Sequence, residues 1–245
     1  MKKHIPNAIT LLNMFCGCIA VVYAFEGRLY ISGWLIFLAA ILDFLDGFFA
    51  RALQVQSKTG KELDSFADLI SFGFAPAIIL YALISKGLST VEDCEIFTIV
   101  MPFVAFLITL CSAIRLAKFN TDTRSRNNFY GLPTPANAIL IGSLPLILVQ
   151  DSALSGISFV FLHQLIRNPL FLIILTFLLS MLLISNIRLL SLKFHSYSWS
   201  DNKVQYLFLA TSIILLIIFF YIGIPLLMMA YFMFSHIAGS SVSKA

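Results

Sequence analysis

Apolar stretches long enough to cross a membrane recur along the whole chain, and they restrict its possible folds. Of the 245 residues, 60% are hydrophobic and only 11% are charged, whereas soluble domains carry about 25% charged residues. About 20 apolar residues in a helix span the ~30 Å hydrocarbon core of a bilayer. We therefore predict an all-α fold, a polytopic transmembrane bundle of about eight helices. They are expected at residues 8–25, 31–50, 64–85, 97–117, 134–150, 168–190, 204–221 and 224–239, with 152–163 as a loop or a further half-helix.

The distribution of Lys and Arg predicts which ends of these helices face the cytoplasm. If the N-terminus is inside, thirteen of the sixteen Lys and Arg residues fall in inner segments, and only Arg28, Lys86 and Arg167 fall outside. Short cytoplasmic loops are generally enriched in these residues. We therefore expect both termini in the cytoplasm. The net charge of +4 follows from these inner loops, which also attract anionic lipid, and nucleic-acid binding is not expected.

Four aspartates interrupt the apolar background, in the pattern D-x2-D-G-x2-A-R-x8-G-x3-D-x3-D that runs from Asp43 to Asp68. Asp43 and Asp46 are three residues apart, and Asp64 and Asp68 are four apart, so each pair shares one face of its helix. A carboxylate at membrane depth costs about 2.5–3.5 kcal/mol, which metal ions would offset. Hard oxygen ligands in this number suit Mg²⁺ or Mn²⁺. The pattern therefore predicts a site for one or two such ions, although Asp64 alone is also explained as a helix N-cap.

Small residues and one arginine accompany the aspartates. Gly47 and Ala50 lie on the same helical face as Asp43, where they let a ligand approach the backbone or a neighbouring helix pack closely. Arg51 is placed either to pair bidentately with phosphate or to extend its charge to the membrane surface. Gly60 is expected in the turn that leads into the third helix.

This pattern resembles, at every fixed position, the signature motif of the CDP-alcohol phosphotransferase family, and the chain is identified as a member. Such enzymes transfer a phosphatidyl or related group from a CDP-linked donor to an alcohol and release CMP. The resemblance implies that Asp43, Asp46 and Asp64 ligate the metal ions, and that Asp68 completes the ligation or acts as the general base. It further implies that the nucleotide and its diphosphate are held by Gly47, Ala50, Arg51 and Gly60.

A second segment bears on the acceptor alcohol. It reads RLAKFN over 115–120 and FYGLPTPAN over 129–137, and it resembles the serine-using branch of the family, the CDP-diacylglycerol–serine O-phosphatidyltransferases. The N-terminal residues 5–17 resemble the same branch, which places Asn7 and Thr10 on the nucleotide side. Serine carries a carboxylate and an ammonium, so its site needs a cation and neutral polar groups. The candidates for contact with the acceptor or the lipid phosphate are Arg115, Lys118, Asn120 and Asn137, of which Arg115 and Lys118 are equally explained as inner-side charges.

Taken together, the resemblances imply phosphatidyl transfer from CDP-diacylglycerol to L-serine at the cytoplasmic face of a prokaryotic inner membrane. The family often forms homodimers, so a homodimer is a possible assembly. We expect one integral membrane domain over 1–245, with a catalytic core at about 1–190, the aspartates on helices within 31–85, and additional membrane helices at 204–239. Two alternatives stay open. One is the same chemistry with glycerol 3-phosphate, inositol or inositol phosphate as acceptor, and the other is a cation transporter.

Overall fold

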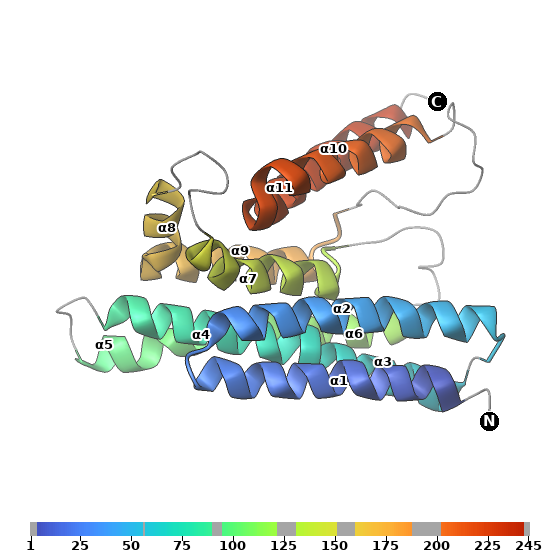
Figure 1. The fold of residues 1–245 in the computed structure, drawn as a ribbon, viewed down its shortest axis with the longest axis horizontal. Coiled ribbons are helices and arrows are strands. Elements are labelled where there is room, and N and C mark those ends of the chain that lie inside the picture. The colour runs from blue at the N-terminus through green and yellow to red at the C-terminus, as the bar shows by residue number, and fades with distance from the viewer. Residues whose placement is uncertain are drawn as a thin grey trace.

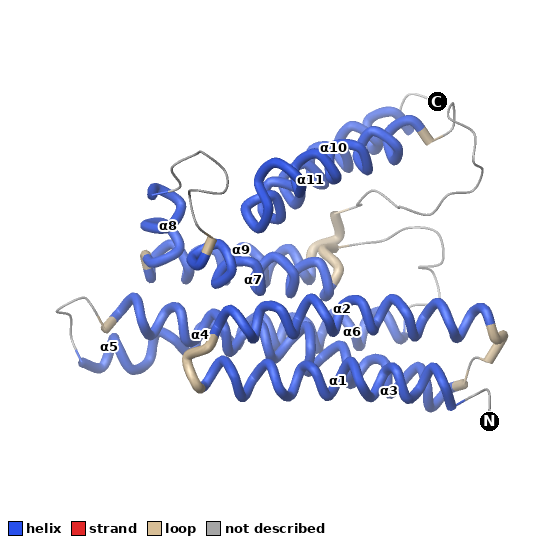
Figure 2. Tube along the Cα trace, in the orientation of Figure 1, coloured by secondary structure: helices blue, strands red, loops and turns tan. Residues whose placement is uncertain are grey.

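The computed structural model describes residues 4–55, 57–89, 95–121, 131–150, 160–187 and 202–242, without the side chains of 95 and 236–242. Within these ranges every regular element is a helix (Figure 2). The elements are α1 (His4–Phe25), α2 (Leu29–Ala52), α3 (Lys58–Asp68), η1 (Leu69–Phe74), α4 (Ala75–Leu88), α5 (Glu95–Val100), η2 (Met101–Phe106), α6 (Leu107–Thr121), α7 (Thr134–Val149), α8 (Val160–Arg167), α9 (Pro169–Ile184), α10 (Lys203–Phe219), η4 (Phe220–Ile222) and α11 (Gly223–Val242).

The predicted all-helical membrane fold is confirmed. Five continuous helical segments are long and apolar enough to cross a membrane, and α8 and α9, which meet at an angle of 77°, make a sixth if they count as one broken span. The last of the five segments is itself a hairpin, because the chain reverses near Phe220, whose φ is 50°, and α10 then packs against α11. Each of the eight predicted helices therefore has a counterpart, and the short α8 precedes the sixth.

The third helix begins earlier than predicted. It starts at Lys58 instead of residue 64, because Ser57 caps it: the Ser57 hydroxyl accepts a hydrogen bond from the backbone N–H of Gly60 at 3.0 Å, which satisfies one of the orphan donors of a helix start. Gly60 consequently lies in the first turn of α3, not in a preceding loop. The sixth helix is also shorter than predicted, since α9 ends at Ile184, while 188–190 lie outside the described residues.

The span from Lys58 to Leu88 is the central helix of the bundle. In the most apolar 18-residue stretch of this span, 67% of the residues are buried, whereas in the same stretch of the other four spans only 17–33% are buried. Its middle is a π-helix, η1, which begins directly after Asp68; single π-helical turns inside α-helices are frequent at functional sites. Two hydrogen bonds to neighbouring helices brace it, since Ser71 of η1 donates to the carbonyl of Asn13 in α1 at 3.0 Å and Thr109 of α6 donates to the carbonyl of Gly73 at 3.1 Å.

Small residues allow two close contacts between helices of the bundle. A Cβ at Gly17 of α1 would lie 2.8 Å from the Cα of Ser71, and a Cβ at Gly33 of α2 would collide with the carbonyl of Gly142 in α7. Helix packing in membranes depends on such close backbone contact because lipid supplies no hydrophobic drive. The glycines thus fix α1 against η1 and α2 against α7.

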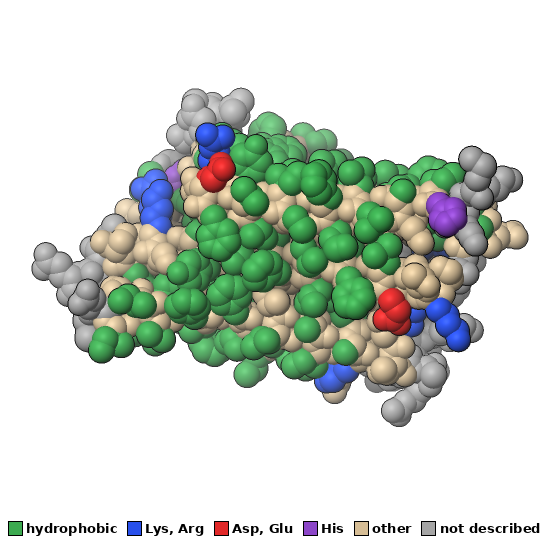
Figure 3. Space-filling view, turned by 90° about the horizontal axis from the view of Figure 1, so that it is seen from below, with side chains coloured by type: hydrophobic (Ala, Val, Ile, Leu, Met, Phe, Trp, Pro, Cys, Tyr) green, Lys and Arg blue, Asp and Glu red, His purple; other side chains and the backbone are tan. Residues whose placement is uncertain are grey.

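Figure 1 shows α1 to α6 lying nearly parallel, with α7 and α9 beside them and the α10–α11 hairpin crossing at an angle on the far side of α7. In the same view, α1 begins and α11 ends at the same end of the molecule. One face of the surface shows a broad hydrophobic middle with charged side chains mostly toward the two ends (Figure 3). This arrangement suits a membrane-spanning bundle, and the cytoplasmic orientation of the termini stays a prediction.

Candidate metal and nucleotide site

Three of the four aspartates converge between α2 and α3. Asp43, Asp64 and Asp68 each offer a carboxylate oxygen, and these oxygens all lie within 4.8 Å of one another. Asp46 is buried at the edge of this group, close enough to interact electrostatically with the other three. The four residues form one aspartate cluster, as the i,i+3 and i,i+4 spacings predicted.

The aspartate cluster fits a hard divalent cation. Within the described ranges, no Lys or Arg lies at ion-pair distance from any of the four carboxylates. One oxygen of Asp46 and one of Asp68 are buried without a hydrogen-bond partner, and buried polar atoms normally have one. Carboxylate oxygens are the ligands that Mg²⁺ and Mn²⁺ prefer. A bound cation would satisfy these oxygens and remove the mutual repulsion of the carboxylates.

The position of Asp64 excludes its explanation as a helix cap. Asp64 and Asp68 are the seventh and eleventh residues of α3, because the helix starts at Lys58 and its N-cap is Ser57. The favourable helix dipole extends only over the first turn, so it does not compensate either carboxylate. Both side chains are therefore placed by the packing of α3 against α1, not by the chemistry of a helix end.

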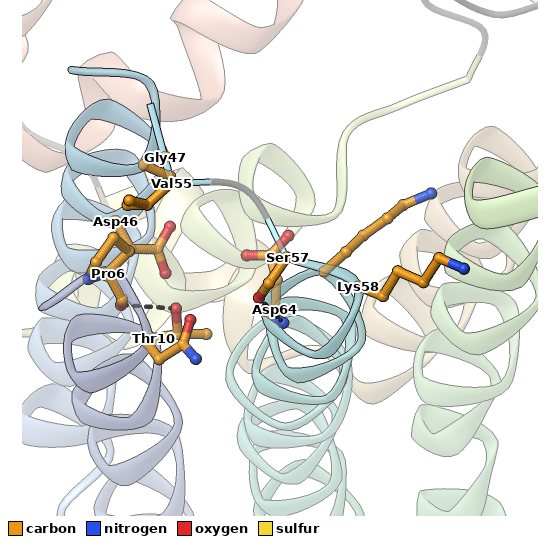
Figure 4. A pocket seen from close by; sticks show the side chains of 12 residues that line it. Pro6, Thr10, Asp46, Gly47, Val55, Ser57, Lys58 and Asp64 are labelled. Carbon is orange, nitrogen blue, oxygen red and sulfur yellow. Dashed lines mark hydrogen bonds between the residues drawn. The ribbon is translucent and has the colours of Figure 1, made fainter. Parts of the chain in front are cut away.

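A pocket of about 450 Å³ opens beside the aspartate cluster, between the start of α1, the end of α2 and the start of α3. Figure 4 shows Asp46 on α2 and Asp64 on α3 facing this pocket from opposite sides. All the residues predicted to lie near the nucleotide, except Arg51, line the pocket. The lining residues are Pro6, Asn7, Thr10, Asp46, Gly47, Ala50, Val55, Ser57, Lys58, Gly60, Lys61 and Asp64.

Two glycines line this pocket without adding side chains to it. A Cβ at Gly60 would lie 3.0 Å from the side-chain oxygens of Asn7 and Ser57, so only glycine leaves Asn7 in its present place. At Gly47, a Cβ would have the guanidinium of Arg51 3.6 Å away as its nearest neighbour. Arg51 is exposed and folds back over Gly47 at the mouth of the pocket. Its predicted contact with the diphosphate remains untested.

The four candidates for the acceptor site have different surroundings. Arg115 is half-buried, its Nε is buried without a partner, and it lies close enough to Asp68 for electrostatic interaction. Asn137 of α7 is fully buried, and neither atom of its amide has a partner. Lys118 is exposed. Arg115 and Asn137 thus offer unused hydrogen-bonding capacity inside the bundle, whereas Lys118 does not.

Asn120 connects two helices. Its amide nitrogen donates to the hydroxyl of Ser65 at 2.8 Å, and its carbonyl accepts from the ammonium of Lys61 at 3.3 Å. The Lys61 contact is made to the backbone carbonyl of Asn120 and the Ser65 contact to its side-chain amide, and both hold the end of α6 against α3, the helix that carries Asp64 and Asp68. In this structure Asn120 therefore helps to position the helix that carries part of the aspartate cluster. Its predicted contact with the acceptor stays a prediction.

The Gly-Leu-Pro segment before α7 is held by α9. The backbone N–H of Gly131 donates to the carbonyl of Ile187, and that of Leu132 donates to the carbonyl of Leu182, both at 3.0 Å. Gly131 has φ +71°, and a Cβ there would lie 2.8 Å from two carbonyl oxygens, so the position requires glycine. This contact sets where α7 begins and therefore where Asn137 lies.

Sequence reasoning did not find Tyr231. This residue of α11 is half-buried and packs against Phe208 of α10, with ring centroids 5.6 Å apart, and it lies close enough to Arg115 for electrostatic interaction. The sequence around Tyr231 is an apolar run without a motif, so no local signal indicated this contact. The C-terminal hairpin therefore reaches the region of the candidate acceptor site.

Comparisons with known proteins extend over the part of the chain that forms the site. A family model described as CDP-alcohol phosphatidyltransferase matches residues 3–162. A CDP-diacylglycerol–serine O-phosphatidyltransferase of Helicobacter pylori is 36% identical over 138 residues, which cover 56% of this chain and 54% of that protein. One of Bacillus subtilis is 35% identical over 137 residues, 54% of this chain and 70% of that protein. An archaetidylserine synthase of Methanothermobacter thermautotrophicus is 36% identical over 142 residues, 57% of this chain and 56% of that protein.

The similarity covers only part of the relative and only part of this chain. The chain spans about half the length of the first of these relatives, and α10 and α11 lie beyond the residues that the family model matches. All four aspartates and Arg115, together with Asn137, lie inside the match. The similarity therefore covers the whole candidate site except Tyr231.

Proposed function

The chain belongs to the CDP-alcohol phosphatidyltransferase family, and from this we propose that it transfers a phosphatidyl group from CDP-diacylglycerol to the hydroxyl of L-serine, with phosphatidylserine and CMP as products. The observation that carries the proposal is the convergence of Asp43, Asp64 and Asp68 within 4.8 Å beside a pocket lined by residues of the same motif. A transporter is not supported, because the family is one of transferases.

The donor occupies the pocket and the aspartate cluster together. The cytidine nucleotide lies against Gly47, Ala50 and Gly60, where the absence of larger side chains lets it approach the helix backbones, with Asn7 and Thr10 on the α1 side. Arg51 reaches the diphosphate from the mouth of the pocket with its planar fork of donors. The aspartate cluster would hold Mg²⁺ or Mn²⁺, which would neutralise charge on the diphosphate and polarise the attacked phosphorus.

The transfer itself needs one bond to form and one to break. The serine hydroxyl oxygen attacks the phosphorus that bears the diacylglycerol, the bond from this phosphorus to the oxygen of CMP breaks, and CMP leaves with the bonding electrons. The hydroxyl proton passes to Asp68, whose buried oxygen has no other partner and which would act as the general base. The same residue can alternatively complete the metal ligation, and metal-binding measurements on Asp68→Asn separate the two roles.

Serine is favoured as acceptor by two sets of observations. The Helicobacter and Bacillus relatives carry serine in their names, and so does the archaetidylserine synthase. In the structure, Arg115 lies within electrostatic range of Asp68 and has an unpaired buried Nε, so it would bind the serine carboxylate on the side of the aspartate cluster. Asn137, fully buried and unpaired, would accept from the ammonium. The excess of Lys and Arg near this end supports a cytoplasmic position for the site.

Release of CMP tests the proposal. The purified protein in neutral detergent receives CDP-diacylglycerol, Mn²⁺ or Mg²⁺, and one acceptor at a time: L-serine, glycerol 3-phosphate or inositol. We expect CMP only with serine and metal, and none from Asp64→Asn. Glu62→Gln is the matched control, because it removes the same charge from an exposed position of the same helix and should leave the rate unchanged.

Each other outcome has a separate meaning. CMP release with glycerol 3-phosphate or inositol instead of serine would retain the role of the aspartate cluster and refute the assignment of Arg115 and Asn137 to serine. No CMP release with any acceptor, from protein that still binds the metal, would refute the proposed reaction.

A further inference from the structure

A second cavity lies at the opposite end of the bundle from the aspartate cluster. Its volume is about 510 Å³, and its apolar walls include Leu83 of α4, Leu148 of α7 and Ile166 of α8. Leu29, at the start of α2, also lines it; Asp46 is seventeen residues further along the same helix, or about 25 Å at 1.5 Å per residue. This cavity is therefore separate from the candidate active site and belongs to the other side of the membrane.

Two of the three cationic residues expected at this side of the membrane line the cavity. Only three, Arg28, Lys86 and Arg167, are expected there from the charge distribution. Arg28 is paired with Glu26 at 3.7 Å, and the other two both line the cavity. No Asp or Glu is among its lining residues in the described part of the chain. Two cations at an apolar cavity whose described lining holds no carboxylate favour an anionic ligand with an apolar portion.

The backbone holds the two cations near one another. Lys86 is followed by Gly87, where a Cβ would lie 2.9 Å from the carbonyl oxygen of Arg167 and 3.1 Å from Pro169. The end of α4 therefore packs directly on the junction of α8 and α9. This contact brings together two cations that are eighty-one residues apart in the sequence.

Arg167 also lines a neighbouring cavity of about 540 Å³, whose walls include Leu88, Phe97 and Ile173. A single guanidinium thus stands between two apolar cavities. Tyr30, 47% exposed, lines the first of them, and tyrosine side chains are typical of the membrane–water interface. One anionic headgroup with two acyl chains matches this arrangement, while a small soluble anion would leave both apolar cavities unused.

We propose that Lys86 and Arg167 bind the phosphate of an anionic phospholipid in the leaflet opposite the aspartate cluster, with its acyl chains against the walls of the two cavities. The ordinary behaviour of such residues is to extend into water along the membrane surface. Their common cavity and the pairing of the third cation distinguish this site from that behaviour. The lipid is a resident ligand and not the substrate, because the reacting groups lie at the other end of the bundle.

The test is the binding of defined lipids by the purified full-length protein. Phosphatidylglycerol or phosphatidylcholine is added in neutral detergent, and native mass spectrometry counts the lipid retained. One cation near an anionic lipid contributes about fivefold in affinity, so Lys86→Gln/Arg167→Gln should bind phosphatidylglycerol about 25-fold more weakly. Arg28→Gln, the matched control, should bind like the unmodified protein, and phosphatidylcholine binding should be the same in all three.

Three further results decide the proposal. Equal binding of phosphatidylglycerol by the double variant and by Arg28→Gln would overturn it, and so would displacement of the lipid by millimolar inorganic phosphate. Asp64→Asn, which should lack turnover, is expected to keep the lipid. The lipid site and the proposed reaction therefore fail or succeed independently.

Discussion

Removal of one carboxylate from the aspartate cluster should stabilise the protein without metal and abolish its stabilisation by metal. In Asp68→Asn the side chain keeps its shape but loses its charge. Asp68 has two partners, Asp43 and Asp64, with oxygens within 4.8 Å. At that distance two like charges repel by about 0.9 kcal/mol in water and about 3.5 kcal/mol at an effective dielectric constant of 20. At a pH at which all three carboxylates are ionised, loss of two such pairs relieves about 1.7 kcal/mol at the dielectric constant of water and more in a less polar environment.

Thermal unfolding in neutral detergent measures both effects. A change of 1 kcal/mol shifts Tm by about 2–4 °C in a chain of this size, so in EDTA, at a pH that ionises the three carboxylates, the Tm of Asp68→Asn should exceed that of the unmodified protein by about 3 °C or more. With Mn²⁺ at a hundredfold excess over Kd, the unmodified protein gains about 2.7 kcal/mol, or about 5–11 °C. The variant should gain little.

Glu62→Gln serves as the control, because it removes one charge from an exposed position of the same helix. Its Tm should equal that of the unmodified protein both in EDTA and with Mn²⁺. A lower Tm for Asp68→Asn in EDTA, or a full metal response in that variant, would refute the argument that Asp68 is a repelled member of a metal site.

Three other changes test the neighbouring contacts. Gly60→Val should raise KM for CDP-diacylglycerol at least tenfold and lower Tm by a few degrees, because the new side chain displaces Asn7 from the pocket wall and also meets the Ser57 hydroxyl that caps α3; an unchanged KM would contradict the placement of the nucleotide. Gly131→Ala should lower Tm by several degrees, since a residue with a Cβ is strained at φ +71° and this Cβ would lie 2.8 Å from two carbonyl oxygens. A Tm within 1 °C of that of the unmodified protein would contradict the requirement for glycine at this position. Tyr231→Phe should raise KM for serine several-fold and leave KM for CDP-diacylglycerol unchanged, because Tyr231 lies within electrostatic range of Arg115; equal changes in both constants would indicate a purely structural role.

The sequence was most informative where a local pattern has a geometric consequence. Apolar windows of membrane length identified the eight helices, and the spacing within each aspartate pair predicted which face it occupies. The predicted start of α3 was wrong, because hydropathy detects only the apolar part of a helix. Residues Lys58 to Glu62 are mostly polar, and they are helical because Ser57 caps the helix before them.

The remaining features depend on residues far apart in the chain. The π-helix after Asp68 is braced by hydroxyl contacts between three separate helices, which no local pattern encodes. Asn120 was assigned to the acceptor site because it belongs to a motif, but its partner Ser65 is 55 residues away. Tyr231 lies in an uninterrupted apolar run, and only the packing of the hairpin brings it toward Arg115.

Incorporation of labelled L-serine into lipid tests the central claim most directly. The purified protein is incubated with CDP-diacylglycerol, labelled serine and Mn²⁺, and the lipid product is identified by mass spectrometry. We predict that phosphatidylserine forms in equal amount with CMP, that it forms in Glu62→Gln, and that it is absent in Asp64→Asn and after removal of metal. Phosphatidylserine formation that persists in Asp64→Asn, or its absence from unmodified protein that binds both donor and metal, would contradict the account.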